Sequence, residues 1–287
     1  MILDSIDVDL NQDTFLSHPI ILIDSFKSLI GIDLEKSKKI RHNLTPYINS
    51  YISLGKPISS SNKKVSDFNS ANVSISLISL YDILKTGDIN NCETIIFEIL
   101  NVSDGKHILE YLLELSLLQS GKSFIIITSI IRCMEFCDSP NMFKFILLAA
   151  KAIILDEDLE PVENKSFNNV FNIENYVLTN FQLIIFGYII DFQNKTWIRK
   201  DKINNNLDVF KKNIFNGTKL FRYKNNYKFI KQIKACGRVC LLDFIDLDNF
   251  SITNLFHLNA IRCLIKNNIP NNISAYYLNE LFEKNEI

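Results

Sequence analysis

The sequence predicts an all-α protein, either an irregular helical bundle or a short stack of αα-hairpins like those of helical-repeat proteins. Between residues 87 and 156, apolar runs of about 12–15 residues alternate with short polar breaks, and such runs are too long and too unalternating for half-buried strands. The breaks, such as Ser103-Asp104-Gly105, combine helix-starting and helix-ending residue types. With 287 residues, 47% of them hydrophobic, the chain can bury a core without disulfides.

The helices can be placed in order along the chain. Two are expected around Ile20–Ile30 and Leu34–Ile52, and the Ser-rich stretch Gly55–Ala71 is the best linker candidate. Further helices are expected to begin near residues 90, 105, 122 and 140. This spacing of about 16 residues corresponds to two αα-hairpins, although no signature residues repeat.

The stretch Met142–Leu155 is expected to be the central buried helix. Only Lys144 and Lys151 interrupt its apolar surface, and because they are seven residues apart they are predicted to share one narrow outward stripe. The buried side is expected to carry Leu147, Ala150 and Ile154.

A second break, Asp156–Asn172, separates this block from the C-terminal part of the chain. A long apolar helix is predicted from about Ile173 to Phe192, and the polar segment Gln193–Tyr227 is predicted to be rich in loops. Helical character returns at Phe229–Ile245 and Ser251–Lys266.

The charges divide the chain into an acidic helical region, residues 1–160, and a basic helical region, residues 173–287, expected to pack as one compact unit. The segment Lys195–Arg238 holds 13 Lys or Arg against two acidic residues, a net charge of +11 that leaves −12 for the remainder. Aromatic residues interleave with these charges: Trp197, Phe210, Phe215, Phe221, Tyr223, Tyr227 and Phe229.

Cations that neutralise phosphates, combined with aromatic faces that stack on bases, are typical of surfaces that bind single-stranded nucleic acid or another polyanion. The candidate contact residues are Lys211, Lys212, Lys219, Arg222, Tyr223, Lys224, Tyr227, Lys228, Lys231 and Lys234. The alternative is a basic segment that docks on the acidic remainder or is simply solvated.

A histidine and two carboxylates form a candidate metal site. His107, Glu110 and Glu114 follow the i, i+3, i+7 spacing of one helix face, and these residue types ligate transition metals. The alternative is a polar stripe in salt bridges, and an antiparallel hairpin with its turn at Ser120-Gly121 would set Glu110 opposite Arg132. No cofactor other than such a metal ion is expected.

Two other patterns have structural explanations. The pairs Cys133/Cys137 and Cys236/Cys240 have i, i+4 spacing and could supply four thiolates, but buried cysteines are more often small hydrophobic residues. The stretch Ser120-Gly121-Lys122-Ser123 resembles the end of a phosphate-binding loop, but it follows a helix rather than a strand and lacks the motif's first glycine. A turn between helices is expected there.

The absence of a recognisable catalytic motif favours a non-enzymatic helical interaction or scaffold protein with a protein partner. The alternatives are nucleic-acid or polyanion binding through residues 195–238, and a metal-dependent enzyme in a helical bundle. No stretch reaches the roughly 18–20 uninterrupted apolar residues of a membrane-spanning helix, and the N-terminus lacks a targeting pattern, so a cytoplasmic protein is expected.

Overall fold

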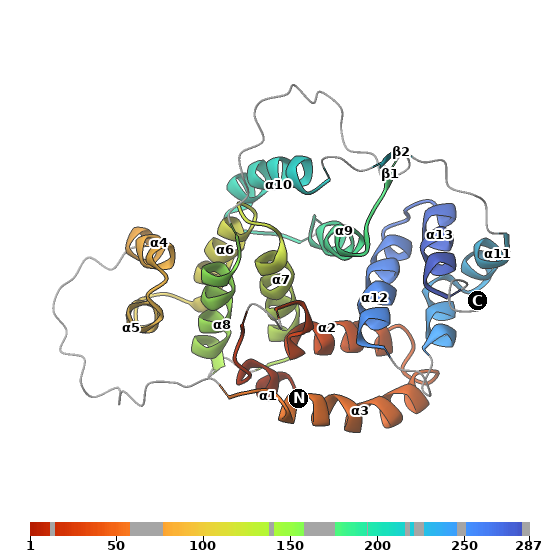
Figure 1. Cartoon of the computed structure of the whole chain (residues 1–287), viewed down its shortest axis with the longest axis horizontal. Coiled ribbons are helices and arrows are strands. Elements are labelled where there is room, and N and C mark those ends of the chain that lie inside the picture. Colours follow the sequence, from red (N-terminus) through yellow and green to blue (C-terminus); the bar gives the residue numbers. More distant parts are fainter. Residues whose placement is uncertain are drawn as a thin grey trace. The chain divides into compact units, whose positions relative to one another are not determined.

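The computed structural model describes residues 1–11, 15–57, 77–137, 141–157, 176–193, 195–215, 219–220, 227–245 and 251–282. Over these residues the protein is all-α, as the sequence predicts, with 13 α-helices (Figure 1). The described strands are the two-residue β1 (Tyr176–Val177) and β2 (Lys219–Leu220), which pair antiparallel with Tyr176 opposite Leu220.

The chain folds into two compact units, and each is assembled from three separate stretches. Unit 1 contains Met1–Ile20, Tyr51–Asp158 and Trp197–Asn206. Unit 2 contains Ile21–Ser50, Leu159–Thr196 and Leu207–Ile287. Each unit contains residues from both sides of residue 160: Trp197–Asn206 belongs to unit 1, and Ile21–Ser50 belongs to unit 2. The two units therefore differ from the acidic and basic regions of the sequence.

Unit 1 is built around the helix that the sequence predicts to be central. Its helices are α1 (Ile2–Ile6), α4 (Leu77–Thr86), α5 (Ile89–Leu100), α6 (Gly105–Ser116), α7 (Lys122–Met134) and α8 (Met142–Leu155), together with the 3-10 turn η1 (Phe15–Ser17). Helix α8 packs against α1, α4, α5, α6 and α7. Leu147 and Ala150 are buried and Ile154 is half-buried, so the prediction of a buried helix is confirmed.

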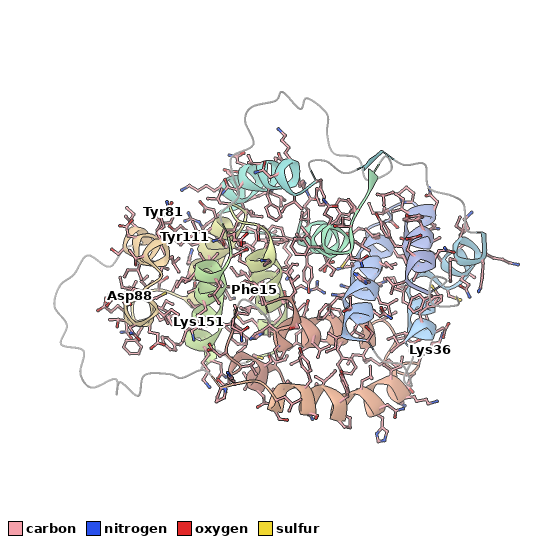
Figure 2. The ribbon with its side chains drawn as sticks, in the orientation of Figure 1. Phe15, Lys36, Tyr81, Asp88, Tyr111 and Lys151 are labelled. Atoms are coloured by element: carbon pink, nitrogen blue, oxygen red, sulfur yellow. The ribbon has the colours of Figure 1, made fainter. Side chains whose placement is uncertain are left out.

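One part of that prediction is wrong. Lys144 lies at the surface, but Lys151 is buried rather than facing out. Both lysines bind carboxylates of the N-terminal stretch: Lys144 Nζ lies 2.6 Å from Asp7 Oδ1, and Lys151 Nζ lies 3.0 Å from Asp9 Oδ1. Lys151 is labelled in Figure 2. Seven-residue spacing places two side chains on one stripe of a helix, but the covering chain decides whether that stripe meets water.

Unit 2 contains most of α2 (Pro19–Ile30) and α3 (Lys38–Ser53), and continues with α9 (Asn180–Gln193), the C-terminal part of α10 (Lys200–Ile214), α11 (Tyr227–Cys236), the 3-10 helix η5 (Gly237–Phe244), α12 (Ile252–Lys266) and α13 (Asn271–Phe282). Helices α9 and α12 pack closely at Gly187 of α9 and Ala260 of α12. A Cβ atom on Gly187 would lie only 2.8 Å from Ala260 Cα, so a larger residue does not fit there. Tyr188 on α9 donates a hydrogen bond to the buried Asp24 on α2, at 2.9 Å.

The segment that the sequence predicts to be loop-rich instead contains α10, a 15-residue helix. Its Asn-rich composition conceals an apolar stripe, since Ile203, Leu207 and Phe210 follow the i, i+4, i+7 spacing and are all buried. The sequence also does not predict α4 or α13. Most of the proposed linker Gly55–Ala71, and residues 158–172 of the second break, lie outside the described residues.

The turn between α6 and α7 is stabilised by a carboxylate from the end of α8. Gly121 precedes α7 with φ +106° and has no side chain to cap the helix. Asp156 Oδ2 accepts hydrogen bonds from Ser123 N at 2.8 Å and Ser123 Oγ at 2.7 Å, and Oδ1 accepts one from Ser120 Oγ. The stretch Ser120–Ser123 is therefore a helix–helix turn, as expected, and Asp156 caps α7 from a distant part of the chain.

Replacement of Asp156 by alanine is expected to cost about 2–3 kcal/mol of unfolding free energy, because it leaves the buried N–H of Ser123 and the hydroxyl group of Ser120 without this acceptor, while the hydroxyl group of Ser123 keeps Gln119 Oε1. The matched control is Asp88→Ala, which removes the local cap of α5 from Asn91 N and should cost about 1 kcal/mol. Urea unfolding of the two variants measures the difference. Equal losses would show that Asp156 acts only as a local cap.

Among the described residues, no helix is both long enough and apolar enough to cross a membrane.

Candidate polyanion-binding surface

The described part of the basic segment divides into two helices with different surroundings. In α10 and its N-terminal approach, Arg199 and Lys211 lie next to carboxylates. The lysines of α11 have no carboxylate partner among the described residues, and Lys228 Nζ lies 5.5 Å from the centroid of the Phe229 ring. Arg222, Tyr223 and Lys224 lie outside the described residues, and the side chains of Lys219 and Tyr227 are not described either. The candidate residues whose side chains are described are Lys211, Lys212, Lys228, Lys231 and Lys234.

On α10 the two candidate lysines differ. Lys211 is half-buried, its Nζ lies 3.9 Å from Asp208 Oδ1, and burial lowers the pKa of its ammonium group. Lys212 is exposed. Because a partly desolvated lysine next to a carboxylate offers less charge to a ligand, α10 contributes one clear cation, Lys212, from the candidate set.

Helix α11 separates apolar and basic residues onto two faces. Phe229 and Ile233 are buried, at 2% and 3% exposure, and α11 packs against α13 and η5. Lys228, Lys231 and Lys234 are exposed, and among the described residues none of the three has a carboxylate partner. We call these three side chains the lysine face of α11.

The lysine face has a spacing suited to a chain of phosphates. Its members follow one another at intervals of three residues, so each is about 4.5 Å further along the helix axis than the one before. Long lysine side chains extend from such positions into solvent as mobile point charges. The lysine face can therefore contact consecutive charged groups of an extended polyanion.

The aromatic half of the sequence hypothesis is wrong for three residues. Phe210, Phe215 and Phe229 are buried, at 0%, 4% and 2% exposure, and cannot stack on a base. Phe215 packs edge-on against Phe186 with ring centroids 5.7 Å apart, and Phe229 packs edge-on against Phe244 at 5.4 Å. They interleave with lysines because an amphipathic helix alternates core and surface residues.

The histidine and carboxylate stripe of α6 binds protein groups. Glu110 Oε2 accepts hydrogen bonds from the backbone N–H groups of Ile198 at 2.9 Å and Arg199 at 3.0 Å. Glu114 Oε2 binds Arg199, 2.7 Å from Nε and 2.6 Å from Nη2. His107 is exposed. These carboxylates therefore hold the approach to α10 against α6. The salt bridge of Glu114 with Arg199 agrees with the alternative of a polar stripe in salt bridges.

Glu110 also does not take the partner expected from the hairpin. Helices α6 and α7 do pack together, and Thr128 and Arg132 are buried like Glu110, so the centre of the polar seam is buried. However, Glu110 binds the backbone before α10 rather than Arg132. The sequence shows that Arg199 lies in a strongly basic segment and could bind a carboxylate. However, Arg199 is far from Glu114 along the chain, so the sequence does not identify them as a pair.

The cysteines are all free, and the two pairs belong to different units: Cys133/Cys137 to unit 1 and Cys236/Cys240 to unit 2. Burial raises the pKa of the Cys240 thiol to about 11, which opposes thiolate formation at neutral pH. Across the described part of the chain, no group of three or more His, Cys, Asp or Glu side chains is placed to hold a metal ion.

Comparison of the chain with protein-family models, with curated proteins and with solved structures found no match.

Proposed function

We propose that this protein is a non-enzymatic helical binding protein and that its partner is a single-stranded nucleic acid, bound through the lysine face of α11. The observation that carries the proposal is the arrangement of Lys228, Lys231 and Lys234, which are exposed along one helix and have no carboxylate partner among the described residues. Phosphate contacts of this kind release counterions and give a binding affinity that depends on salt.

The burial of Phe210, Phe215 and Phe229 supports a backbone-reading mode. With those rings in the core, contacts from the lysine face go to phosphates, which carry no sequence information. We therefore expect the lysine face to bind single-stranded nucleic acid without regard to its base sequence. The competing interpretation is a protein partner, which the sequence favours. Such a partner would have to be acidic to complement the positive charge of the lysine face.

The test is charge reversal of all three lysines to glutamate, followed by fluorescence anisotropy with a labelled single-stranded oligonucleotide over a range of salt concentrations. At low salt the affinity should fall at least tenfold. For three lost phosphate contacts, the slope of log K against log salt should become shallower by about 2. Far-UV circular dichroism should show unchanged helicity, since the three side chains are exposed.

A matched control separates a binding face from net charge. Lys39, Lys56 and Lys106 are also exposed, and reversing all three makes the same change in total charge. This control should keep most of the affinity and the salt slope of the original protein. Equal losses in both triple variants, or an unchanged affinity in the α11 variant, would overturn the proposal. Binding to an acidic protein or to anionic vesicles without binding to the oligonucleotide would also overturn it.

A further inference from the structure

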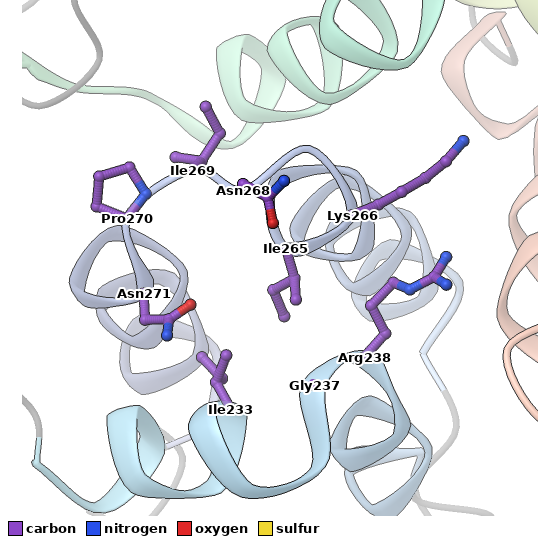
Figure 3. Close-up of a pocket in the computed structure, with 9 residues that line it drawn as sticks. All are labelled: Ile233, Gly237, Arg238, Ile265, Lys266, Asn268, Ile269, Pro270 and Asn271. Carbon is purple, nitrogen blue, oxygen red and sulfur yellow. The ribbon is translucent and has the colours of Figure 1, made fainter.

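Unit 2 contains a pocket of about 500 Å³ where α11 meets η5 and α12 connects to α13 (Figure 3). A volume of this size is typical of sites for small organic ligands. The pocket is close to the lysine face in sequence, because two residues that line it are Ile233, which lies between Lys231 and Lys234, and Arg238, four residues after Lys234.

The pocket combines an apolar side with two amides. Ile233 is buried on α11 and Ile265 is half-buried in the last turn of α12, and Figure 3 shows both side chains directed into the same space. Asn268 lines the pocket from the α12–α13 connection, and Asn271 lines it from the first turn of α13. An apolar surface with amide donors and acceptors at its edge is suited to a flat heterocycle.

The positive charge of the pocket comes from Arg238 and Lys266. In Figure 3, Arg238 lies on the side of the space opposite Asn271. Lys266 Nζ binds Asp191 Oδ1 at 2.5 Å, so its charge is largely balanced, whereas Arg238 has no carboxylate partner among the described residues. The guanidinium of Arg238 is therefore the group available to bind an anion, and its planar fork of donors matches a phosphate.

We propose that this pocket binds one nucleotide, with the phosphate on Arg238, the base against the half-buried Ile265, and the base edge on the amides of Asn268 and Asn271. The inference rests on the proposed function, since it supplies the base contacts that the lysine face lacks. A strand that lies along Lys228, Lys231 and Lys234 would place its end, or one flipped-out base, in the pocket. A free mononucleotide offers the same phosphate and base chemistry.

The experiment uses the full chain and isothermal titration calorimetry with the four nucleoside 5′-monophosphates and with inorganic phosphate. At least one mononucleotide should bind more tightly than inorganic phosphate. Arg238→Gln should weaken that binding at least tenfold. Asn268→Gly should alter the preference among the four bases, and glycine suits this position because Asn268 has φ +57°. Arg41→Gln, which changes an exposed arginine of α3, is the control and should have no effect.

Single-stranded oligonucleotides with and without a 5′-phosphate distinguish a strand end from an internal base, since only the former prefers the phosphorylated strand. Inorganic phosphate that binds as well as every mononucleotide would overturn the nucleotide assignment. So would the absence of mononucleotide binding, even where charge reversal of the lysine face still weakens oligonucleotide binding and supports the proposed function. Mononucleotide binding that requires Arg238, without any strand binding, would support the pocket and overturn the proposed function.

Discussion

Leu147→Asp is expected to unfold unit 1 or to destabilise it by more than about 4 kcal/mol. Leu147 is 3% exposed in the middle of α8, which packs against five other helices of unit 1. The substitution removes a buried apolar side chain and places a charged carboxylate in the core, and each of these changes costs several kcal/mol. Lys151, one turn further along α8, is already bound to Asp9. A loss of this size approaches the total stability of an ordinary domain.

Leu147→Ala is the quantitative companion, because a milder loss leaves folded protein on which the free energy of unfolding can be measured. Truncation of a buried leucine to alanine should cost about 2–5 kcal/mol in urea unfolding followed by circular dichroism. The matched control is Ile78→Asp on α4, where the side chain is 71% exposed, and it should change stability by about 0.5 kcal/mol or less. A similarly small change for Leu147→Ala would show that α8 is not the core of the unit.

Acid is expected to destabilise both units, because each contains one buried neutral histidine. His18 in unit 1 is 1% exposed, its Nδ1 accepts a hydrogen bond from Ile20 N at 3.2 Å, and its Nε2 lies 3.1 Å from Val8 O. Burial lowers the pKa of His18 to about 4. His257 in unit 2 is 3% exposed, its Nε2 has no hydrogen-bond partner among the described residues, and burial lowers its pKa to about 4 as well.

The direction of the effect follows from which state binds the proton. An unfolded histidine, with a pKa near 6.5, takes up a proton more readily than either buried ring, so acid favours the unfolded chain. The stabilisation is complete above about pH 6.5 and is lost as the pH falls from there towards about 4. Each histidine should account for about 3 kcal/mol of that loss.

Urea unfolding at several pH values between about 7.5 and 4.5 measures this dependence. His257→Leu should flatten the pH dependence of unit 2 alone, and His18→Gln that of unit 1 alone, with hydrogen exchange used to follow the two units separately. His42→Gln changes an exposed histidine of α3 and is the control. If neither His18→Gln nor His257→Leu changes the pH profile, protonation of these rings does not drive the loss.

Local sequence patterns closely predict helices α5 to α8 of unit 1, but not α4. Helices α5, α6 and α7 begin at residues 89, 105 and 122, and α8 spans Met142–Leu155 as expected. These positions are predictable because N-caps, glycine stops and 3.6-residue periodicity act within a few residues of each helix end. The same reasoning misses α10, where an Asn-rich composition obscures a correct apolar spacing, and α13, where Pro270 and Asn271 suggest a loop.

The sequence by itself therefore determined the all-α class, the position of the buried helix α8 and the accumulation of positive charge between residues 195 and 238. Only the tertiary structure decided the environment of individual side chains. Lys151 is buried because Asp9 reaches it, Phe229 is in the core because α11 packs on α13, and Glu110 and Glu114 hold the approach to α10 instead of a metal. Helix formation depends on neighbours in the sequence, whereas burial and charge pairing depend on which distant segments meet, and no local pattern encodes that.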